Sequence, residues 1–124
     1  MLRIKAEIRR CTDLGRWKLI FYKLRYPAVR WAKGVRIPGS LRIHGDVEVE
    51  IGSETVIEGA LVIVGTGRVR IGQRARFGSA NGPNRLDLCA SGAIIDIGSR
   101  CFINGAKLVS RKRVTLGALC MLGD

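Results

Sequence analysis

Histidine, acidic residues and long apolar runs are all scarce in this sequence of 124 residues. One histidine and four cysteines are present, but no Cys-x-x-Cys pair occurs and no histidine lies at ligand spacing, which argues against a zinc site. No apolar run approaches the roughly 20 residues of a membrane span. The start, Met1 to Lys5, interleaves charge where a secretory signal would be apolar. We therefore expect one small cytoplasmic domain that binds no metal.

Positive charge is what the sequence has in excess, and most of it lies near the start. Lys and Arg number 22 against ten Asp and Glu, giving a net charge of +12. Residues 1–36 hold eleven basic residues, only two acidic ones and five of the seven aromatic residues. No helix-turn-helix, RRM, zinc-finger or OB pattern accompanies the charge, so we expect no nucleic-acid partner. The composition divides the chain into a basic aromatic segment, 1–34, and a Gly/Val/Ile-rich body, 35–124.

The N-terminal segment predicts a helix that ends before Pro27. Thr12 or Asp13 can cap its start. Residues 2–9 fit both strand alternation and a helix face, and we favour a helix. The apolar positions that we expect to pack against the body are Trp17, Ile20, Phe21 and Leu24. Basic residues beside tryptophan and tyrosine are also typical of helices at membrane surfaces, so peripheral membrane contact of residues 1–34 is the alternative.

The body repeats a short motif: a β-branched residue, a polar residue, an aliphatic residue and then glycine. The clean copies are Val49–Gly52, Val69–Gly72, Ile95–Gly98 and Val114–Gly117. We interpret Val35–Pro38 as a fifth, imperfect copy. Each clean copy is followed by a small residue and then by another large apolar one, which gives a period of six. The small residues are Thr55, Ala75, Cys101 and Cys120, and the large ones are Ile57, Phe77, Ile103 and Leu122.

A period of six fits neither an α-helix, whose faces recur every 3.6 residues, nor a two-faced strand. It predicts a three-sided coil in which the aliphatic residues point inward and glycine relieves the corners. Successive coils would stack, so that Ile51, Ile71, Ile97 and Leu116 form one column. The spacings between the copies also predict a loop of about eight residues within Ser79–Arg85, which is rich in turn formers. Cys101 and Cys120 fall at small interior positions, where a free thiol packs as a small apolar group.

Residues 35–124 resemble the bacterial hexapeptide-repeat acyltransferases. The resemblance implies an all-β fold, a left-handed parallel β-helix, preceded here by an N-terminal α-helical segment. It also implies acetyl-CoA as acyl donor, O-acetyl transfer to a sugar of a surface polysaccharide or lipopolysaccharide precursor, and a homotrimer with sites between subunits. Residues 12–34 resemble the helical lead-in of cell-surface polysaccharide O-acetyltransferases. The γ-class carbonic anhydrases share the fold but need three histidines, so the single histidine excludes that branch.

The resemblance also suggests residues that would contact the acceptor. Cys101–Asn104 falls where the maltose/galactoside branch carries an asparagine that holds the acceptor, so Asn104 is expected to do the same. Inserted loops in these solenoids often shape an acceptor pocket, and Asn84 and Arg85 are donors suited to a sugar hydroxyl or carboxylate. An ordinary solvated turn is the other interpretation of that loop.

No catalytic residue is expected within the chain itself. The general-base histidine of the family would follow about nine residues beyond Asp124, so we expect further coils there. The only histidine, His44, is expected to be a surface residue in a turn beside Gly45 and Asp46. The alternative function is a non-catalytic module, either trimerising or peripheral to the inner face of the membrane.

Overall fold

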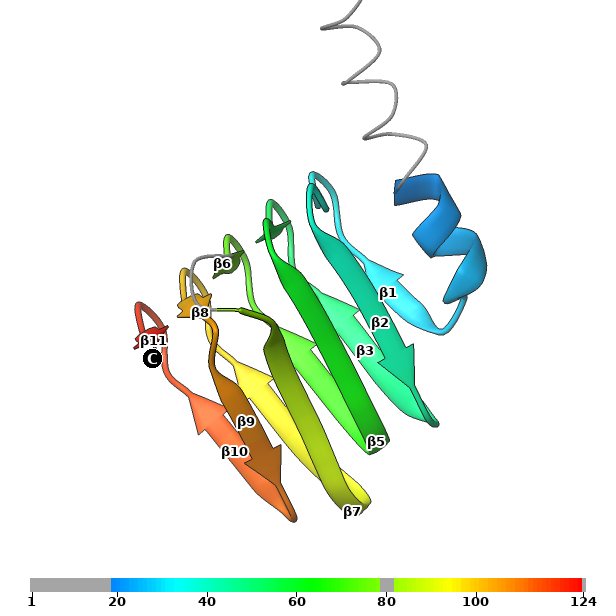
Figure 1. Cartoon of the computed structure of the whole chain (residues 1–124), viewed down its shortest axis with the longest axis vertical. Helices are drawn as coiled ribbons and strands as arrows, with labels where there is room; N and C mark the ends of the chain where they lie inside the picture. The colour runs from blue at the N-terminus through cyan, green and yellow to red at the C-terminus, as the bar shows by residue number, and fades with distance from the viewer. Residues whose placement is uncertain (1–18, 79–81, 124) are drawn as a thin grey trace, which may run out of the picture.

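The computed structural model describes residues 19–78 and 82–123, which form a parallel β-solenoid of about five turns with one short helix (Figure 1). Residues 19–25 are helical. The strands are β1 (Val29–Trp31), β2 (Ser40–His44), β3 (Val47–Ile51), β4 (Val56–Ile57), β5 (Ala60–Ile71), β6 (Arg76–Gly78), β7 (Asn84–Ile97), β8 (Phe102–Asn104), β9 (Lys107–Ser110), β10 (Arg113–Leu116) and β11 (Met121–Gly123).

The strands of successive turns stack on three faces. The first face holds β1, β3, the second halves of β5 and β7, and β10. The second face holds β4, β6, β8 and β11. The third face holds β2, the first halves of β5 and β7, and β9. Strands β5 and β7 therefore pass from the third face to the first without a break, with a register shift between Gly65 and Gly67.

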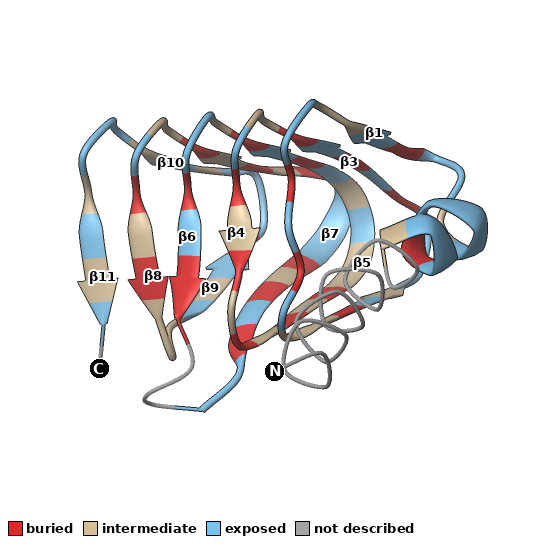
Figure 2. Cartoon of the chain, turned by 90° about the horizontal axis from the view of Figure 1, so that it is seen from above, coloured by how far each residue is buried: buried red, intermediate tan, exposed pale blue. Residues whose placement is uncertain are grey.

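The solenoid is left-handed, as the resemblance implies. In Figure 1 the chain runs down the near side in β2, returns up the far side in β3, and advances from right to left. Figure 2, seen from above, shows β4, β6, β8 and β11 carrying the chain from the far side to the near side. Most parallel crossovers have the opposite hand.

The predicted interior columns are present in the structure. Ile51 lies opposite Ile71, Ile71 opposite Ile97, and Ile97 opposite Leu116. The second column is also confirmed by the pairs on the second face, and its members are Ile57, Phe77, Ile103 and Leu122. In β3 buried and exposed residues alternate strictly, because successive side chains of a strand point to opposite faces (Figure 2).

The fifth copy of the motif, Val35–Pro38, does not stack with the four clean copies. The copy that pairs with Val49–Ile51 is β1, Val29–Trp31, which lies before position 35. Arg36 instead bridges to Val56 on the second face, so Val35–Pro38 lies one hexad further along the coil. The physical reason is that all three faces carry the same six-residue pattern, so the pattern fixes the period but not the face.

The extra length of the third turn is divided between two corners instead of forming one loop. Phe77 pairs with Ile57, 20 positions earlier, while Asn84 pairs with Leu61, 23 positions earlier. Ala93 then pairs with Gly67, 26 positions earlier. Three additional residues therefore precede Asn84, within the expected segment. Three more lie between Leu88 and Ala93, where the sequence pattern predicts no insertion.

The helix packs through a different face from the one predicted. Leu19, Tyr22 and Tyr26 contact the core, whereas Ile20, Phe21 and Leu24 are exposed. The other member of the predicted face, Trp17, lies outside the described residues, as do residues 2–9 and the expected cap. The helix ends at residue 25, before Pro27, as predicted.

Two tyrosine hydroxyls explain why this face is chosen. The backbone N–H of Leu41 donates to the hydroxyl of Tyr22 at 3.3 Å, and that of Ile43 donates to the hydroxyl of Tyr26 at 3.3 Å. Both donors lie on β2, which pairs with β5. An unpaired strand edge exposes N–H groups to other chains, and here hydroxyls occupy those groups instead. The helix is therefore fixed by polar bonds to a strand edge, which hydrophobic periodicity alone does not predict.

Candidate functional site

The three predicted site residues gather at one corner of the solenoid, between the second and third faces. Gly78 ends β6, Asn84 and Arg85 begin β7, and Asn104 ends β8. We call this group, together with the following Gly105, the asparagine corner. The register offset rises from 20 to 23 positions at this corner, so it is one of the two places where the chain departs from a regular solenoid.

Asn84 is fully buried and its amide bonds to the backbone of neighbouring turns. Its Nδ2 donates to the carbonyl of Ala60 at 3.2 Å and to that of Gly78 at 2.9 Å. Its Oδ1 accepts from the N–H of Gly105 at 2.7 Å. Both N–H bonds of the amide are therefore used inside the protein, and no donor is left for the sugar hydroxyl that the sequence analysis assigned to it. We attribute the position to the fold.

Asn104 is half-buried and lies in register with Gly78 on β6. A side chain at position 78 would meet Asn104 Oδ1 at 2.9 Å, so glycine leaves the space that this amide occupies. The N–H of Gly105, the next residue, is held by Asn84. The buried asparagine therefore fixes the backbone from which the more accessible one projects.

Arg85 is the member of the asparagine corner that lies on the outer surface, where it belongs to a small cluster of charged side chains. Its Nε donates to Asp87 Oδ1 at 2.8 Å, and Lys107 Nζ lies 3.5 Å from Asp87 Oδ2. The Asp87 side chain is only 14% exposed, whereas Arg85 and Lys107 are about half exposed, so two cations face solvent over one covered carboxylate. This net positive cluster suits a carboxylate or phosphate group as well as hydroxyls.

His44 is exposed at the end of β2, next to Gly45, whose φ of 99° marks a turn. The turn predicted for this histidine is therefore present. In register, His44 lies opposite Val64, which in turn lies opposite Asp87. Two strand spacings, about 10 Å, thus separate the histidine backbone from that of Asp87. His44 is therefore not a member of the asparagine corner, and it lies two turns from the Asp87 strand along the solenoid.

Cys101 occupies a small interior position, as predicted, and its thiol is a hydrogen-bond donor. Sγ lies 3.0 Å from the carbonyl of Gly117 in the next turn, and Thr55 Oγ1 donates in the same way to Gly72 at 3.1 Å. Burial raises the pKa of the Cys101 thiol, although a backbone hydrogen bond at Cys120 lowers it in part. The neutral, hydrogen-bonded form is thereby favoured.

This environment predicts selective alkylation. With iodoacetamide at pH 8, Cys89, which is exposed, should react at least about a hundred-fold faster than Cys101, because only an accessible thiolate is a nucleophile. Mass spectrometry of tryptic peptides over time measures both rates. In urea the two rates should converge. Equal rates in the folded protein would contradict the buried position of Cys101.

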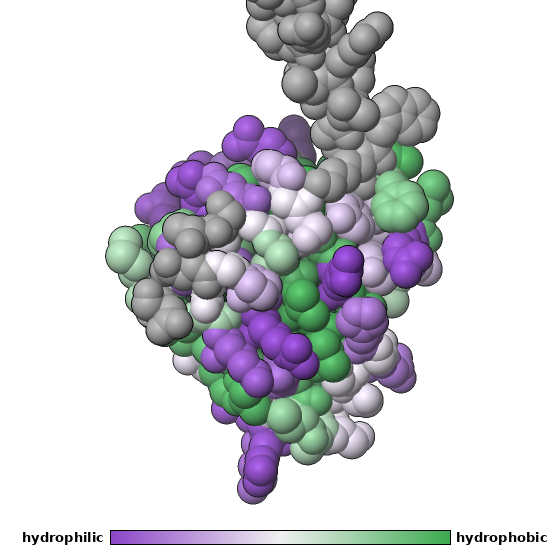
Figure 3. Space-filling model, in the orientation of Figure 1, coloured by the Kyte–Doolittle hydropathy of each residue, from purple (hydrophilic) through white to green (hydrophobic). Residues whose placement is uncertain are grey.

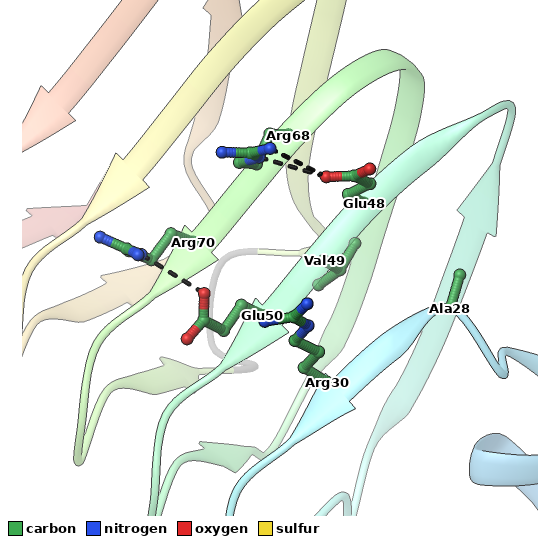
Figure 4. Close-up of a pocket in the computed structure, with 7 residues that line it drawn as sticks. All are labelled: Ala28, Arg30, Glu48, Val49, Glu50, Arg68 and Arg70. Atoms are coloured by element: carbon green, nitrogen blue, oxygen red, sulfur yellow. Dashed lines mark hydrogen bonds and ion pairs between the residues drawn. The ribbon is translucent and has the colours of Figure 1, made fainter.

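A second charged region was not predicted and lies on the outer face of β1, β3 and β5 (Figure 4). Here Glu48 lies 3.2 Å from Arg68 and Glu50 lies 3.4 Å from Arg70, with Arg30 in register with Glu50 on the other side. The pattern continues around the coil, where Glu54 pairs with Arg74 at 2.9 Å and Glu58 pairs with Arg76.

The second turn therefore presents carboxylates and the third turn presents arginines. Each exposed ion pair contributes only about 0–1 kcal/mol, but together they favour one register of the two turns. Because the carboxylates are already paired with arginines, we infer that this surface stabilises the stacking of the two turns and is not a catalytic centre. The signal was available in the sequence, since several of the pairs are 20 residues apart.

No family model, curated protein or solved structure matches the chain. Among residues 19–78 and 82–123, no three His, Cys, Asp or Glu side chains gather in a way that could hold a metal ion. Within the same described ranges, no helix is long and apolar enough to cross a membrane. The fold is therefore established by the strand register, and function has to be argued from the surface of the solenoid.

Proposed function

We propose that the chain is part of a CoA-dependent acyltransferase that transfers an acetyl group to a sugar hydroxyl. The observation that supports this proposal is the left-handed hexad register, whose columns at Ile51 to Leu116 and at Ile57 to Leu122 stack without interruption. The resemblance to the hexapeptide-repeat acyltransferases was based on that register. The sugar would belong to a precursor of a surface polysaccharide or lipopolysaccharide.

Within this proposal, the asparagine corner supplies groups that bind and orient the acceptor. The amide of Asn104 would hold a sugar hydroxyl, and Arg85 would bind a hydroxyl or a carboxylate of the sugar with the N–H groups not directed at Asp87. Asn84 would act only indirectly, by fixing the backbone at Gly105. The proton of the acceptor hydroxyl would be removed by a base outside the asparagine corner, because the corner itself contains neither a histidine nor a carboxylate.

The test is release of CoA from acetyl-CoA in the presence of a panel of sugars, measured by the reaction of the free thiol. The assay should be run on the 124-residue chain and on the product of its whole reading frame, whatever length that product has. The Asn104→Ala variant should raise the KM for the sugar about ten-fold, the value of one lost hydrogen bond, and leave the KM for acetyl-CoA unchanged.

The control is Gln73→Ala, which removes an exposed amide at a different corner and should leave both KM values unchanged. The proposal would be contradicted if the product of the whole reading frame, with the far-UV spectrum of a folded β protein, released no thiol from acetyl-CoA with any of the sugars. An Asn104→Ala variant with unchanged kinetics would remove the role given to that residue.

The second candidate is a non-catalytic module that assembles as a homotrimer. It is favoured by the composition of the asparagine corner, which contains neither a histidine nor a carboxylate that could act as a general base. Multi-angle light scattering distinguishes a monomer of 13.6 kDa from a species of three times that mass. A trimer without turnover favours the module, and a monomer at all accessible concentrations contradicts it.

A further inference from the structure

The outer face of the helix carries three largely exposed apolar side chains, of which Phe21 also meets the ring of Tyr22 edge-on at 5.7 Å. Ile20 is 45% exposed, Phe21 is 57% exposed and Leu24 is 77% exposed. We call these three residues the helix patch. They lie on the side of the helix away from Tyr22 and Tyr26, whose hydroxyls fix the helix to β2. The helix lies at the end of the solenoid (Figure 1), and Figure 3 shows hydrophobic side chains at the surface in that region, beside hydrophilic ones.

The surroundings of the helix patch are strongly basic. No acidic residue occurs between Asp13 and Asp46, whereas Lys23 and Arg25 lie on the helix itself. The eighteen residues that precede the helix add six basic residues against two acidic ones. On the solenoid, by contrast, carboxylates from Glu48 onward neutralise arginines of the following turn. Uncompensated positive charge is therefore concentrated in the part of the sequence that contains the apolar patch.

The positive charge around the helix patch favours one kind of partner over another. A second copy of the chain would bring Lys23 and Arg25 against the same residues of its partner, and like charges across an interface oppose association. An anionic lipid surface satisfies both features at once, because its acyl region accepts apolar side chains while its headgroups attract lysine and arginine. The described helix, residues 19–25, presents Ile20, Phe21 and Leu24 to solvent, as expected of a helix that docks its apolar side on a lipid interface.

We propose that the helix patch docks the solenoid on an anionic lipid surface, with Phe21 and Leu24 entering the headgroup boundary and the flanking basic residues contacting lipid phosphates and carboxylates. The Tyr22 and Tyr26 hydroxyls hold the helix rigidly to β2, so docking also sets the direction in which the solenoid leaves the membrane. This inference concerns attachment and is independent of whether the asparagine corner supports acyl transfer.

Co-sedimentation with vesicles tests the proposal with the full chain. The chain should bind vesicles of phosphatidylcholine and phosphatidylserine and should bind pure phosphatidylcholine at least about ten-fold more weakly. High salt should also weaken binding, since the attraction between exposed charges is screened. The Leu24→Ser variant should lower the partition coefficient about ten-fold, and Lys23→Gln should lower it about five-fold.

Matched controls lie at the other end of the solenoid. Leu119 is 72% exposed, so Leu119→Ser changes the same chemistry at similar exposure and should leave vesicle binding within about two-fold of the original. Lys112→Gln removes one exposed positive charge far from the helix and should also have little effect. All four variants alter exposed side chains, and circular dichroism should show an unchanged fold.

Three results would overturn the proposal. The first is absence of binding to phosphatidylserine vesicles at low salt. The second is binding that falls equally in Leu24→Ser and Leu119→Ser, which would show that the helix patch is not the contact. The third is concentration-dependent dimerisation without lipid that Leu24→Ser abolishes, because a second copy would then be the occupant of the patch.

Discussion

Replacement of Gly72 by alanine should destabilise the solenoid by about 3 kcal/mol, the upper end of the range for an overpacked interior. An added Cβ would lie 2.6 Å from the N atom of Ser99 and 2.7 Å from the carbonyl carbon of Gly98. These are backbone atoms of the next turn, which cannot move aside like the end of a flexible side chain. The two turns would have to separate, and the hydrogen bond from Gly72 N–H to the carbonyl of Ile97, 2.8 Å long, would lengthen. Urea denaturation followed by far-UV circular dichroism measures the loss.

Gly117 provides the control, because it holds the same position in the motif. Nothing lies within 4 Å of a Cβ added there, so Gly117→Ala should change the stability by less than about 0.5 kcal/mol. The difference between the two variants isolates the close approach of turns from any general preference for glycine. Equal losses at both positions would show that the distance between stacked turns does not explain why glycine recurs at this position of the motif.

Substitution of Asn84 by alanine should cost about 3 kcal/mol of stability as well. The change removes three hydrogen bonds, and it leaves the carbonyls of Ala60 and Gly78 and the N–H of Gly105 short of a partner at a buried position. Each buried polar group left without a partner costs about 1–3 kcal/mol, and relaxation of the corner offsets part of the sum. Thermal denaturation of Asn84→Ala beside the original chain measures the effect.

Arg85→Ala is the matched control for Asn84→Ala. The neighbouring arginine is exposed and its ion pair with Asp87 contributes little, so its loss should change stability by less than about 1 kcal/mol. If Asn84→Ala keeps the original stability but alters the use of a sugar, the position serves a ligand and our attribution to the fold is wrong.

The solenoid could be predicted from the sequence because its interior repeats a simple chemical pattern. Aliphatic residues followed by glycine, with small residues four positions later, require a coil with three short faces and a narrow interior. The pairs from Ile51 to Leu116 follow directly from that requirement. The face to which Val35–Pro38 belongs could not be predicted, since each face repeats the same pattern and only the pairing of Val29–Trp31 with β3 resolves it.

The packing face of the helix and the roles of the site residues could not be predicted from neighbouring residues in the sequence, because both depend on contacts between distant parts of the chain. Hydrophobic spacing selected Phe21 and Leu24 as the packing face, but hydrogen bonds from Leu41 and Ile43 to tyrosine hydroxyls select the opposite one. At the asparagine corner, Asn84 and Asn104 have the same chemistry in the sequence. Only the fold distinguishes them, because the amide of Asn84 forms hydrogen bonds with backbone groups of three successive turns.

The alternation of negative and positive side chains between successive turns limits which turns can be duplicated or lost without disturbing the pairing of charges. Solenoids commonly grow or shrink when a segment coding for one unit is duplicated or lost. Here the loss of the turn that bears Glu50 would place Arg30 directly against Arg70, and its duplication would set two layers of carboxylates face to face. The charges therefore favour one order of the turns, and an unequal exchange between copies would give a product in which like charges face each other across adjacent turns.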